Sequence, residues 1–184
     1  MQPRRQHLID TAYRLFNEHG YHATGIDWIL AESGVSKATL YKYFRSKEAL
    51  ILAVLQQRHR EVIDLIRRFV NDAQDNNTNP TLAIFDALDT WFKSDGFFGC
   101  NFINASAEYA QCDDPIHQFA ADHKAAIRQL VSESLITKHR QQLTLEIAIL
   151  IDGAIALAHT SGERDAALIA RRVAARILDQ ESIE

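Results

Sequence analysis

The sequence predicts an all-α fold of about nine helices, with a short three-helix segment at the N-terminus followed by a longer helical region. Only 7 Gly and 3 Pro occur in 184 residues, too few for a β fold rich in tight turns. Apolar residues make up 47% of the chain, which is enough to bury a core. They recur at helical spacing and nowhere keep a period of two, so we expect no sheet.

The first helix is predicted from Arg4 to His19, because one of its faces is apolar at helical spacing. Gly20 follows as the glycine that ends such a helix. The apolar face consists of Leu8, Ile9, Ala12, Leu15 and Phe16.

A short second helix is predicted after Thr24, which stands three residues before Asp27 as in a capping box. Gly34 ends this helix. Its expected inward residues are Ile26, Ile29 and Leu30.

Serine caps predict the next two helices. Ser36 precedes a short third helix, and Ser46 precedes a long fourth helix that extends to about Val70. The polar segment 72–80 is then expected to form a loop. The anchors of the third helix are predicted to be Val35, Leu40 and Phe44.

Five further helices are expected beyond residue 80. Asn79 with Pro80 and Asp114 with Pro115 each combine a capping side chain with a proline suited to the first helical position. The predicted ranges are 80–94, 100–111, 114–136, 142–160 and 163–181.

Charge is distributed unevenly along the chain, although the net charge is -4. Residues 1–47 hold seven Lys or Arg and four Asp or Glu, whereas residues 48–184 hold thirteen and twenty. A basic end suits an approach to phosphate, and an acidic body does not. We therefore predict a DNA-binding domain over 1–47 and a second domain over 48–184, joined by the long helix at about 47–70.

The span 29–44, ILAESGVSKATLYKYF, has the pattern of helix, tight turn and helix. A helix of this kind can read the major groove, because its N-terminus attracts phosphate and its short polar side chains reach base edges. An ordinary helical hairpin with a solvated polar face is the alternative. The polar side chains on the second helix are Lys37, Thr39, Tyr41, Lys42 and Tyr43.

The first 55 residues resemble the TetR family of transcriptional regulators. The resemblance rests on Tyr21 and Thr24 after the Gly20 turn, on GVSKATLYKYF, and on the SKEAL start of the long helix. It implies a homodimeric regulator that binds double-stranded operator DNA with a palindromic sequence. It further implies a repressor that a small-molecule inducer releases from the DNA.

The resemblance also implies roles for individual residues. Ser36, Lys37 and Thr39 would approach bases or phosphates, and the remaining contacts would be to the DNA backbone. Leu30 departs from the family, which often has Ala there, and Trp28 is an unusual residue at a position expected to be exposed. The predicted DNA-binding residues are Thr24, Ser36, Lys37, Thr39, Tyr41, Lys42, Tyr43 and Lys47.

A ligand pocket is predicted around residues 96–110, where Asn101, Asn104 and Glu108 share one helical face. An apolar cavity with a few polar groups suits a small molecule, although the same face could simply be solvated. The predicted ligand-binding residues are Phe85, Trp91, Phe92, Asn101, Asn104, Glu108 and Phe119.

The last two helices are expected to form the dimer interface. Residues 143–158 are apolar almost all the way round, so one face is available for a partner, unless this helix is simply central in a monomer. The residues expected to allow close helix approach are Gly153, Ala154, Ala156 and Ala158, and those expected to form a stripe on the final helix are Ala166, Ala170, Val173, Ala174 and Ile177.

Other classes of protein are less consistent with the sequence. A metal-dependent enzyme would draw on Glu108, Asp113, Asp114, His117 and His123, but no HExxH or repeated ExxH motif occurs. Neither GxSxG, a P-loop nor GxGxxG is present, so we expect no catalytic residues, no metal and no cofactor. An architectural DNA-binding protein without a ligand remains a further alternative.

The expected compartment is the cytoplasm. Cys100 and Cys112 form neither a disulfide framework nor a CxxC motif, which favours a reducing environment. The start of the chain lacks the apolar stretch of an export signal. The longest apolar run, IAILIDGAIALA, contains Asp152 and is shorter than a membrane span of roughly 20 residues, so no membrane association is expected.

Overall fold

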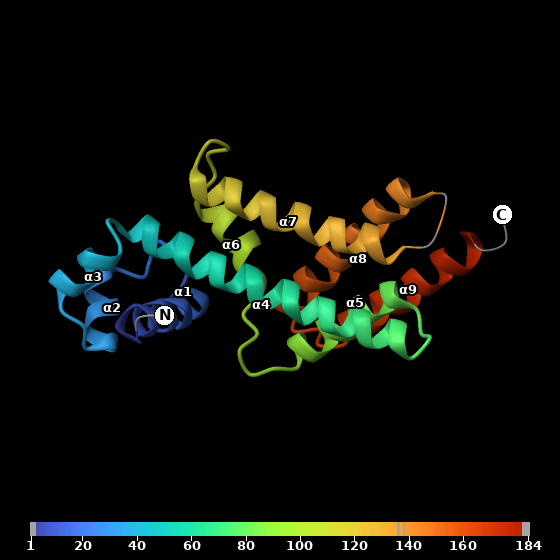
Figure 1. The fold of residues 1–184 in the computed structure, drawn as a ribbon, viewed down its shortest axis with the longest axis horizontal. Helices are drawn as coiled ribbons and strands as arrows, with labels where there is room; N and C mark the ends of the chain where they lie inside the picture. Colours follow the sequence, from blue (N-terminus) through green and yellow to red (C-terminus); the bar gives the residue numbers. More distant parts are fainter. Residues whose placement is uncertain (1–2, 136, 138, 182–184) are drawn as a thin grey trace. The chain divides into compact units, whose positions relative to one another are not determined.

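In the computed structural model, residues 3–135, 137 and 139–181 are described, and these parts of the chain form nine α-helices and no strand (Figure 1). The predicted all-α class is confirmed. The helices are α1 (Pro3–His19), α2 (Ile26–Ser33), α3 (Lys37–Tyr43), α4 (Lys47–Asp75), α5 (Pro80–Phe92), α6 (Asn101–Glu108), α7 (Pro115–Ser134), α8 (Arg140–Thr160) and α9 (Ala166–Glu181).

The helices group into two compact units. Unit 1 comprises Met1–Arg60 and Cys100–His123, and unit 2 comprises Glu61–Gly99 and Lys124–Glu184. The unit boundaries therefore fall inside α4, between α5 and α6, and inside α7, whereas the predicted domain boundary after residue 47 lies in the first turn of α4. Within unit 1, α6 bonds to α1 and to the turn after it.

The core of the helix-turn-helix is formed by α1, α2 and α3, which contact one another pairwise. All five residues of the predicted apolar face of α1 are buried, and so are Ile29, Leu40 and Phe44. Burying one such side chain contributes about 1.5–3 kcal/mol. Ile26, Leu30 and Val35 are only half-buried, so they close the edge of this core and do not lie at its centre.

Four local signals in unit 1 end or begin helices as predicted. Gly20 and Gly34 follow α1 and α2 with φ of 85° and 63°, the left-handed region that glycine tolerates best. The Ser36 hydroxyl accepts a hydrogen bond from the Thr39 amide at 3.2 Å, and Ser46 does the same for Ala49 at 3.2 Å. Each bond satisfies an amide that lacks a helical partner.

The predicted capping box at α2 is wrong. Gly25 is the N-cap residue of α2 and makes no side-chain cap bond. Thr24 instead donates its hydroxyl inward, to the carbonyl oxygens of Leu15 at 3.2 Å and Gly20 at 2.8 Å. Because that hydroxyl is already used within the turn and is fully buried, it is not available to cap α2.

Helix α4 runs to Asp75, five residues beyond its predicted end, so the polar segment 72–80 is helical in its first part. Ala73 is buried in this part, although the residues next to it are polar, so the buried face of α4 extends to its last turn. The loop proper contains Asn77, whose φ is 52°. The predicted end of the helix 114–136 at residue 136 lies outside the described residues, as do the chain ends 1–2 and 182–184.

Unit 2 is built around contacts of α5 with α8 and α9, and of α8 with α9. The predicted cap of α5 is confirmed, since the Asn79 side chain accepts hydrogen bonds from the amides of Thr81 and Leu82. Asp114 likewise accepts from the Ile116 amide at 2.7 Å at the start of α7 in unit 1.

Helix α8 has apolar residues on more than one side, as predicted. One side packs inside unit 2, while Leu145, Ile149 and Leu157 are exposed. By length and composition alone α8 is long and apolar enough to cross a membrane, although its continuous apolar run, 147–158, is shorter than a span. Its buried side and its contacts with α9 are those of a core helix.

Candidate nucleic-acid interface

Helix α3 presents its polar side chains outward from unit 1. Leu40 and Phe44 face the core, whereas Lys37 and Lys42 are exposed and Tyr41 is 46% exposed. Thr39 and Tyr43 are half-buried. This is the arrangement that a recognition helix needs, because an outward polar face is free to enter the major groove.

The start of α3 is polar, and its side chains form hydrogen bonds with one another and with the backbone. The hydroxyls of Ser36 and Thr39 lie 2.9 Å apart, and the Ser36 hydroxyl also caps the helix. Lys37 forms an exposed ion pair with Asp27 at 3.5 Å. Two hydroxyls and an ammonium group therefore gather at the positive end of the α3 dipole, which attracts phosphate.

Lys47 is held more firmly than the sequence indicates. Its ammonium group donates to the backbone carbonyl of His22 at 3.2 Å. Burial lowers the pKa of Lys47, and the carboxylates of Glu48 and Glu108 oppose this effect. Lys47 thus joins the start of α4 to the turn that precedes α2, while Thr24, predicted to contact the DNA backbone, lies beneath the surface of that turn.

Further residues of unit 1 lie near this surface but have no sequence assignment. The Arg5 guanidinium lies 5.1 Å from the centre of the Phe44 ring, so the start of α1 contacts the residue that ends α3. Arg45 is exposed directly after Phe44. The excess of basic residues in 1–47 includes both arginines, but only the packing of α1 on α3 shows that Arg5 lies near the recognition helix.

Trp28 is 39% exposed, and its ring centre lies 4.6 Å from that of His19 on α1. The structure therefore confirms the expected exposure of this unusual residue. The His19 contact holds the indole against the end of α1, on the surface of unit 1.

The predicted ligand-binding residues divide between the two units. Asn101, Asn104, Glu108 and Phe119 belong to unit 1, and Phe85, Trp91 and Phe92 belong to unit 2. In unit 2, Phe85 and Phe92 are fully buried, and the Trp91 ring lies edge-on to Phe97 at 4.9 Å. In unit 1, Asn101 is buried and Asn104 and Glu108 are half-buried.

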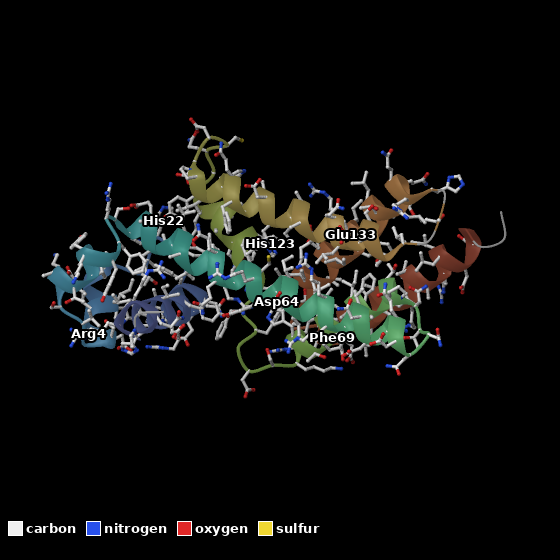
Figure 2. The ribbon with its side chains drawn as sticks, viewed as in Figure 1. Arg4, His22, Asp64, Phe69, His123 and Glu133 are labelled. Carbon is white, nitrogen blue, oxygen red and sulfur yellow. The ribbon has the colours of Figure 1, made fainter. Side chains whose placement is uncertain are left out.

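Two histidines meet inside unit 1. His59 on α4 and His123 on α7, which is labelled in Figure 2, have their Nδ1 atoms 3.1 Å apart. His123 also stacks on Phe102 with ring centres 3.5 Å apart. The sequence singles out His123 only as a possible metal ligand, whereas His117 bonds to the carbonyl of Tyr109 at 2.9 Å. Within the described part of the chain, no three or more His, Cys, Asp or Glu side chains are placed so that they could hold a metal ion.

Helices α8 and α9 expose an apolar surface on unit 2. Gly153 and Ala156 lie on the exposed side of α8 with its large apolar residues, while Ala154 and Ala158 are buried. On α9, all three alanines of the predicted stripe are buried, Val173 is exposed and Ile177 is half-buried. We call this the α8–α9 surface, and its large exposed apolar residues are Leu145, Ile149, Leu157, Ile169 and Val173.

Comparison with known sequences agrees with this geometry. The model of bacterial regulatory proteins of the tetR family matches residues 8–54, which span α1 to the first turns of α4. YxaF of Bacillus subtilis, an uncharacterized HTH-type transcriptional regulator, is 26% identical over 171 residues, 90% of each chain. NemR of Escherichia coli, an HTH-type transcriptional repressor, is 25% identical over 132 residues, 71% of this chain and 66% of NemR.

Solved structures extend the similarity to the whole chain. A TetR-family transcriptional regulator from Streptomyces coelicolor is 31% identical with a TM-score of 0.87, over 97% of this chain and 90% of that one. Reduced NemR has the same fold, with a TM-score of 0.77 and 22% identity over 95% and 97% of the two chains. The chain shares this fold and 31% of its residues with a TetR-family regulator over 97% of its length, and the family model matches its helix-turn-helix. The chain therefore belongs to the TetR family of helix-turn-helix transcriptional regulators.

Proposed function

We propose that the protein is a transcriptional repressor that binds a palindromic operator as a homodimer and is released by a small-molecule inducer. The observation that carries the proposal is the exposed polar face of α3, whose apolar residues Leu40 and Phe44 anchor it to the core. Similarity to the repressor NemR favours repression. The proposed compartment is the cytoplasm, where the operator lies, and we assign the chain no catalytic role.

The proposed DNA contacts follow from how each side chain is presented. Ser36, Lys37 and Thr39 lie at the start of α3, where they would meet base edges and phosphate. Tyr41, Lys42 and Tyr43 lie in the second half of α3 and would contact the DNA backbone on either side of the groove. Lys47 would bind phosphate while it holds the His22 carbonyl.

A second copy of this chain is the proposed partner of the α8–α9 surface. Ile149 is 70% exposed and Leu145 is 57% exposed, which is unusual for large aliphatic side chains unless a partner covers them. An acidic residue flanks the apolar part on α8, and basic residues flank it on α9. A surface with acid on one helix and base on the next complements its own twofold-related copy. The flanking residues are Glu146 on α8 and Arg172 and Arg176 on α9, whereas Asp152 on α8 already pairs with Lys124 at 2.6 Å.

Dimerisation gives the DNA-binding surface its specificity. Successive major grooves on one side of B-DNA are about 34 Å apart, so two recognition helices related by a twofold axis read two half-sites. The operator is then palindromic.

For induction, we propose that the predicted residues of unit 1 on α6 and α7 contact the inducer. Phe119 offers an apolar contact, and Asn104 offers an amide for orientation. An inducer acts only through its preference for the form that does not bind DNA, typically a coupling of about 1–3 kcal/mol.

Selection of duplexes from a random DNA pool by the purified protein tests the DNA-binding function. The selected duplex should be palindromic, and fluorescence anisotropy should show affinity about tenfold weaker for Tyr41→Ala. Tyr41→Phe, which removes only the hydroxyl, is the matched control and should isolate the hydrogen bond to phosphate. Thermal unfolding should remain at the wild-type temperature, because Tyr41 is exposed.

Two results would contradict the proposal. Recovery of no enriched sequence would refute sequence-specific binding. Wild-type affinity in Tyr41→Ala would remove α3 from the DNA interface.

A further inference from the structure

Glu108, the last residue of α6, reaches the turn between α1 and α2. Its Oε1 accepts a hydrogen bond from the Tyr21 amide at 2.8 Å, and its Oε2 accepts one from the His22 amide at 2.6 Å. Oε2 also lies 3.2 Å from Nδ1 of His22. One carboxylate therefore binds two consecutive backbone amides of unit 1, near the position of His22 in Figure 2.

These two amides need a partner from outside the turn. The amide of Gly20 still bonds to the Phe16 carbonyl at 2.9 Å, but those of Tyr21 and His22 lie beyond the end of α1. Hydrogen bonds to an ionised carboxylate are shorter and about twice as strong as neutral ones. A Cβ on Gly20 would lie 3.0 Å from Oε1, so this glycine also allows the carboxylate to approach the backbone.

The rest of α6 holds the same turn through contacts of its own. Tyr21 is buried, and its hydroxyl donates to the carbonyl of Asn101 at 3.1 Å. The side chain of Asn101 donates to Asn17 on α1 at 2.9 Å. Tyr109, directly after α6, stacks on the His22 ring with centres 4.8 Å apart. Both ends of α6 are thus attached to the region around the turn.

The turn between α1 and α2 also positions part of the proposed DNA-binding surface. His22 presents its carbonyl to the ammonium group of Lys47, and Thr24 closes the turn just before α2 begins. A change in the backbone at residues 21 and 22 would move the hydrogen-bond partner of Lys47 and the first residues of α2 together.

We propose that Glu108 is a positioning residue that couples α6 to the DNA-binding surface. While the Glu108 carboxylate accepts the hydrogen bonds of the Tyr21 and His22 amides, the turn holds Lys47 and the start of α2 in the geometry that binds phosphate. Displacement of α6 would remove the Glu108 carboxylate from these amides, and so would a ligand group that competes for the carboxylate. Either change would lower DNA affinity. This inference rests on the proposed DNA-binding function.

The variant Glu108→Gln tests the coupling. Glutamine keeps the size of the side chain, but only one of its two terminal groups accepts a hydrogen bond, so its NH2 group faces one of the amides. We expect DNA affinity to fall by about tenfold or more on the duplex selected by the wild type. Glu108→Asp keeps the charge and both acceptors on a shorter side chain, and should bind DNA with intermediate affinity.

Asp113→Asn is the matched control, because it removes the same charge at an exposed position five residues later. Removing a negative charge by itself leaves binding to DNA unchanged or tightens it. The coupling therefore predicts opposite directions for the two variants, weaker binding for Glu108→Gln and equal or tighter binding for Asp113→Asn.

Amide hydrogen exchange of the free protein, followed by NMR, supplies the second measurement. Exchange at Tyr21 and His22 should be faster in Glu108→Gln than in the wild type, while Gly20, which bonds within unit 1 to Phe16, is the internal reference. Faster exchange at the two amides with weaker DNA binding would support the coupling.

The unfavourable outcomes are distinct. Unchanged exchange would show that the carboxylate does not hold the turn, and faster exchange with wild-type DNA affinity would show that the turn does not control binding. Either result overturns the inference, as would weakening of the same size in Asp113→Asn. If Glu108→Gln fails to fold, Glu108→Asp decides, since wild-type affinity with faster exchange in that variant also refutes the coupling. A wild-type protein that selects no DNA overturns the proposed function itself, and the inference with it.

Discussion

Lys42 and Lys47 are both proposed phosphate contacts, but their ammonium groups are held differently. Lys42 is exposed on α3, whereas Lys47 is half-buried and bonds to the His22 carbonyl. Substitution of Lys47 would remove a contact within unit 1 as well as a charge. Lys42 is therefore the cleaner probe of the electrostatic part of DNA binding.

Lys42→Ala should weaken binding to the selected duplex and to unrelated duplexes by similar factors. Each phosphate contact releases counterions, so the slope of log affinity against log salt should become shallower by about one unit. Affinity measured over a series of salt concentrations checks this result. The control is Lys93→Ala, which removes one positive charge directly after α5 in unit 2. This variant should leave the slope of log affinity against log salt unchanged. A wild-type slope for Lys42→Ala would place this side chain away from the DNA.

Polar side chains at other single positions have roles that depend on their neighbours. Thr24 is three residues before an acidic residue, as in a capping box, yet its hydroxyl bonds to carbonyls on its N-terminal side. Glu108 has the spacing of a pocket residue on α6, and its carboxylate binds two amides of the turn after α1. Neither set of partners is encoded by local spacing, because the partners come from other elements.

At the scale of elements, short-range capping accounts for the starts of α3, α4, α5 and α7. Ser36, Ser46, Asn79 and Asp114 each accept a hydrogen bond from an amide two or three residues later. Such bonds involve neighbours in the chain, so the sequence predicts them directly. The end of α4 was harder to predict, because its last turn is polar and only the burial of Ala73 explains why the helix continues.

The cap of α3 allows stability and DNA binding to be separated. Ser36→Ala should lower the free energy of unfolding by about 1 kcal/mol, because the Thr39 amide loses its partner. Ser36→Asp keeps an acceptor for that amide, but places a negative charge where α3 meets DNA. It should therefore unfold near the wild-type temperature in calorimetry and bind the selected duplex more weakly than Ser36→Ala.

Asn79→Asp is the control for that charge, since it changes one capping side chain for another at the start of α5 in unit 2. It should change DNA affinity little. Equal affinity for Ser36→Asp and the wild type would show that the start of α3 does not approach phosphate.

At the scale of the whole molecule, the two compact units divide the proposed tasks. Unit 1 contains the recognition helix together with α6, and unit 2 contains the α8–α9 surface. Sequence composition places a basic segment at the N-terminus, but does not show that α6 belongs with it. That grouping depends on contacts between residues some 80 positions apart, such as Tyr21 with Asn101.

Ile149→Glu should disrupt the proposed dimer, because a carboxylate at this position would be buried without a partner. We expect dimerisation to weaken by about a hundredfold or more, seen as a shift to the monomer mass in sedimentation equilibrium. Binding to a full operator should fall with it, while binding to a single half-site changes little. Thr90→Glu, at an exposed position of α5, is the control. A stable Ile149→Glu dimer would place the interface elsewhere.

The sequence by itself determined the all-α class, the order of the helices, most of their caps and the family to which the helix-turn-helix belongs. These properties depend on residues within a few positions of one another, where spacing and capping chemistry act. Tertiary structure alone decided that Thr24 is buried, that Lys47 bonds to the His22 carbonyl and that α6 holds the turn before α2. The physical reason is that a polar group bonds to whichever partner packing brings within about 3 Å, and in unit 1 that partner often comes from a distant part of the chain.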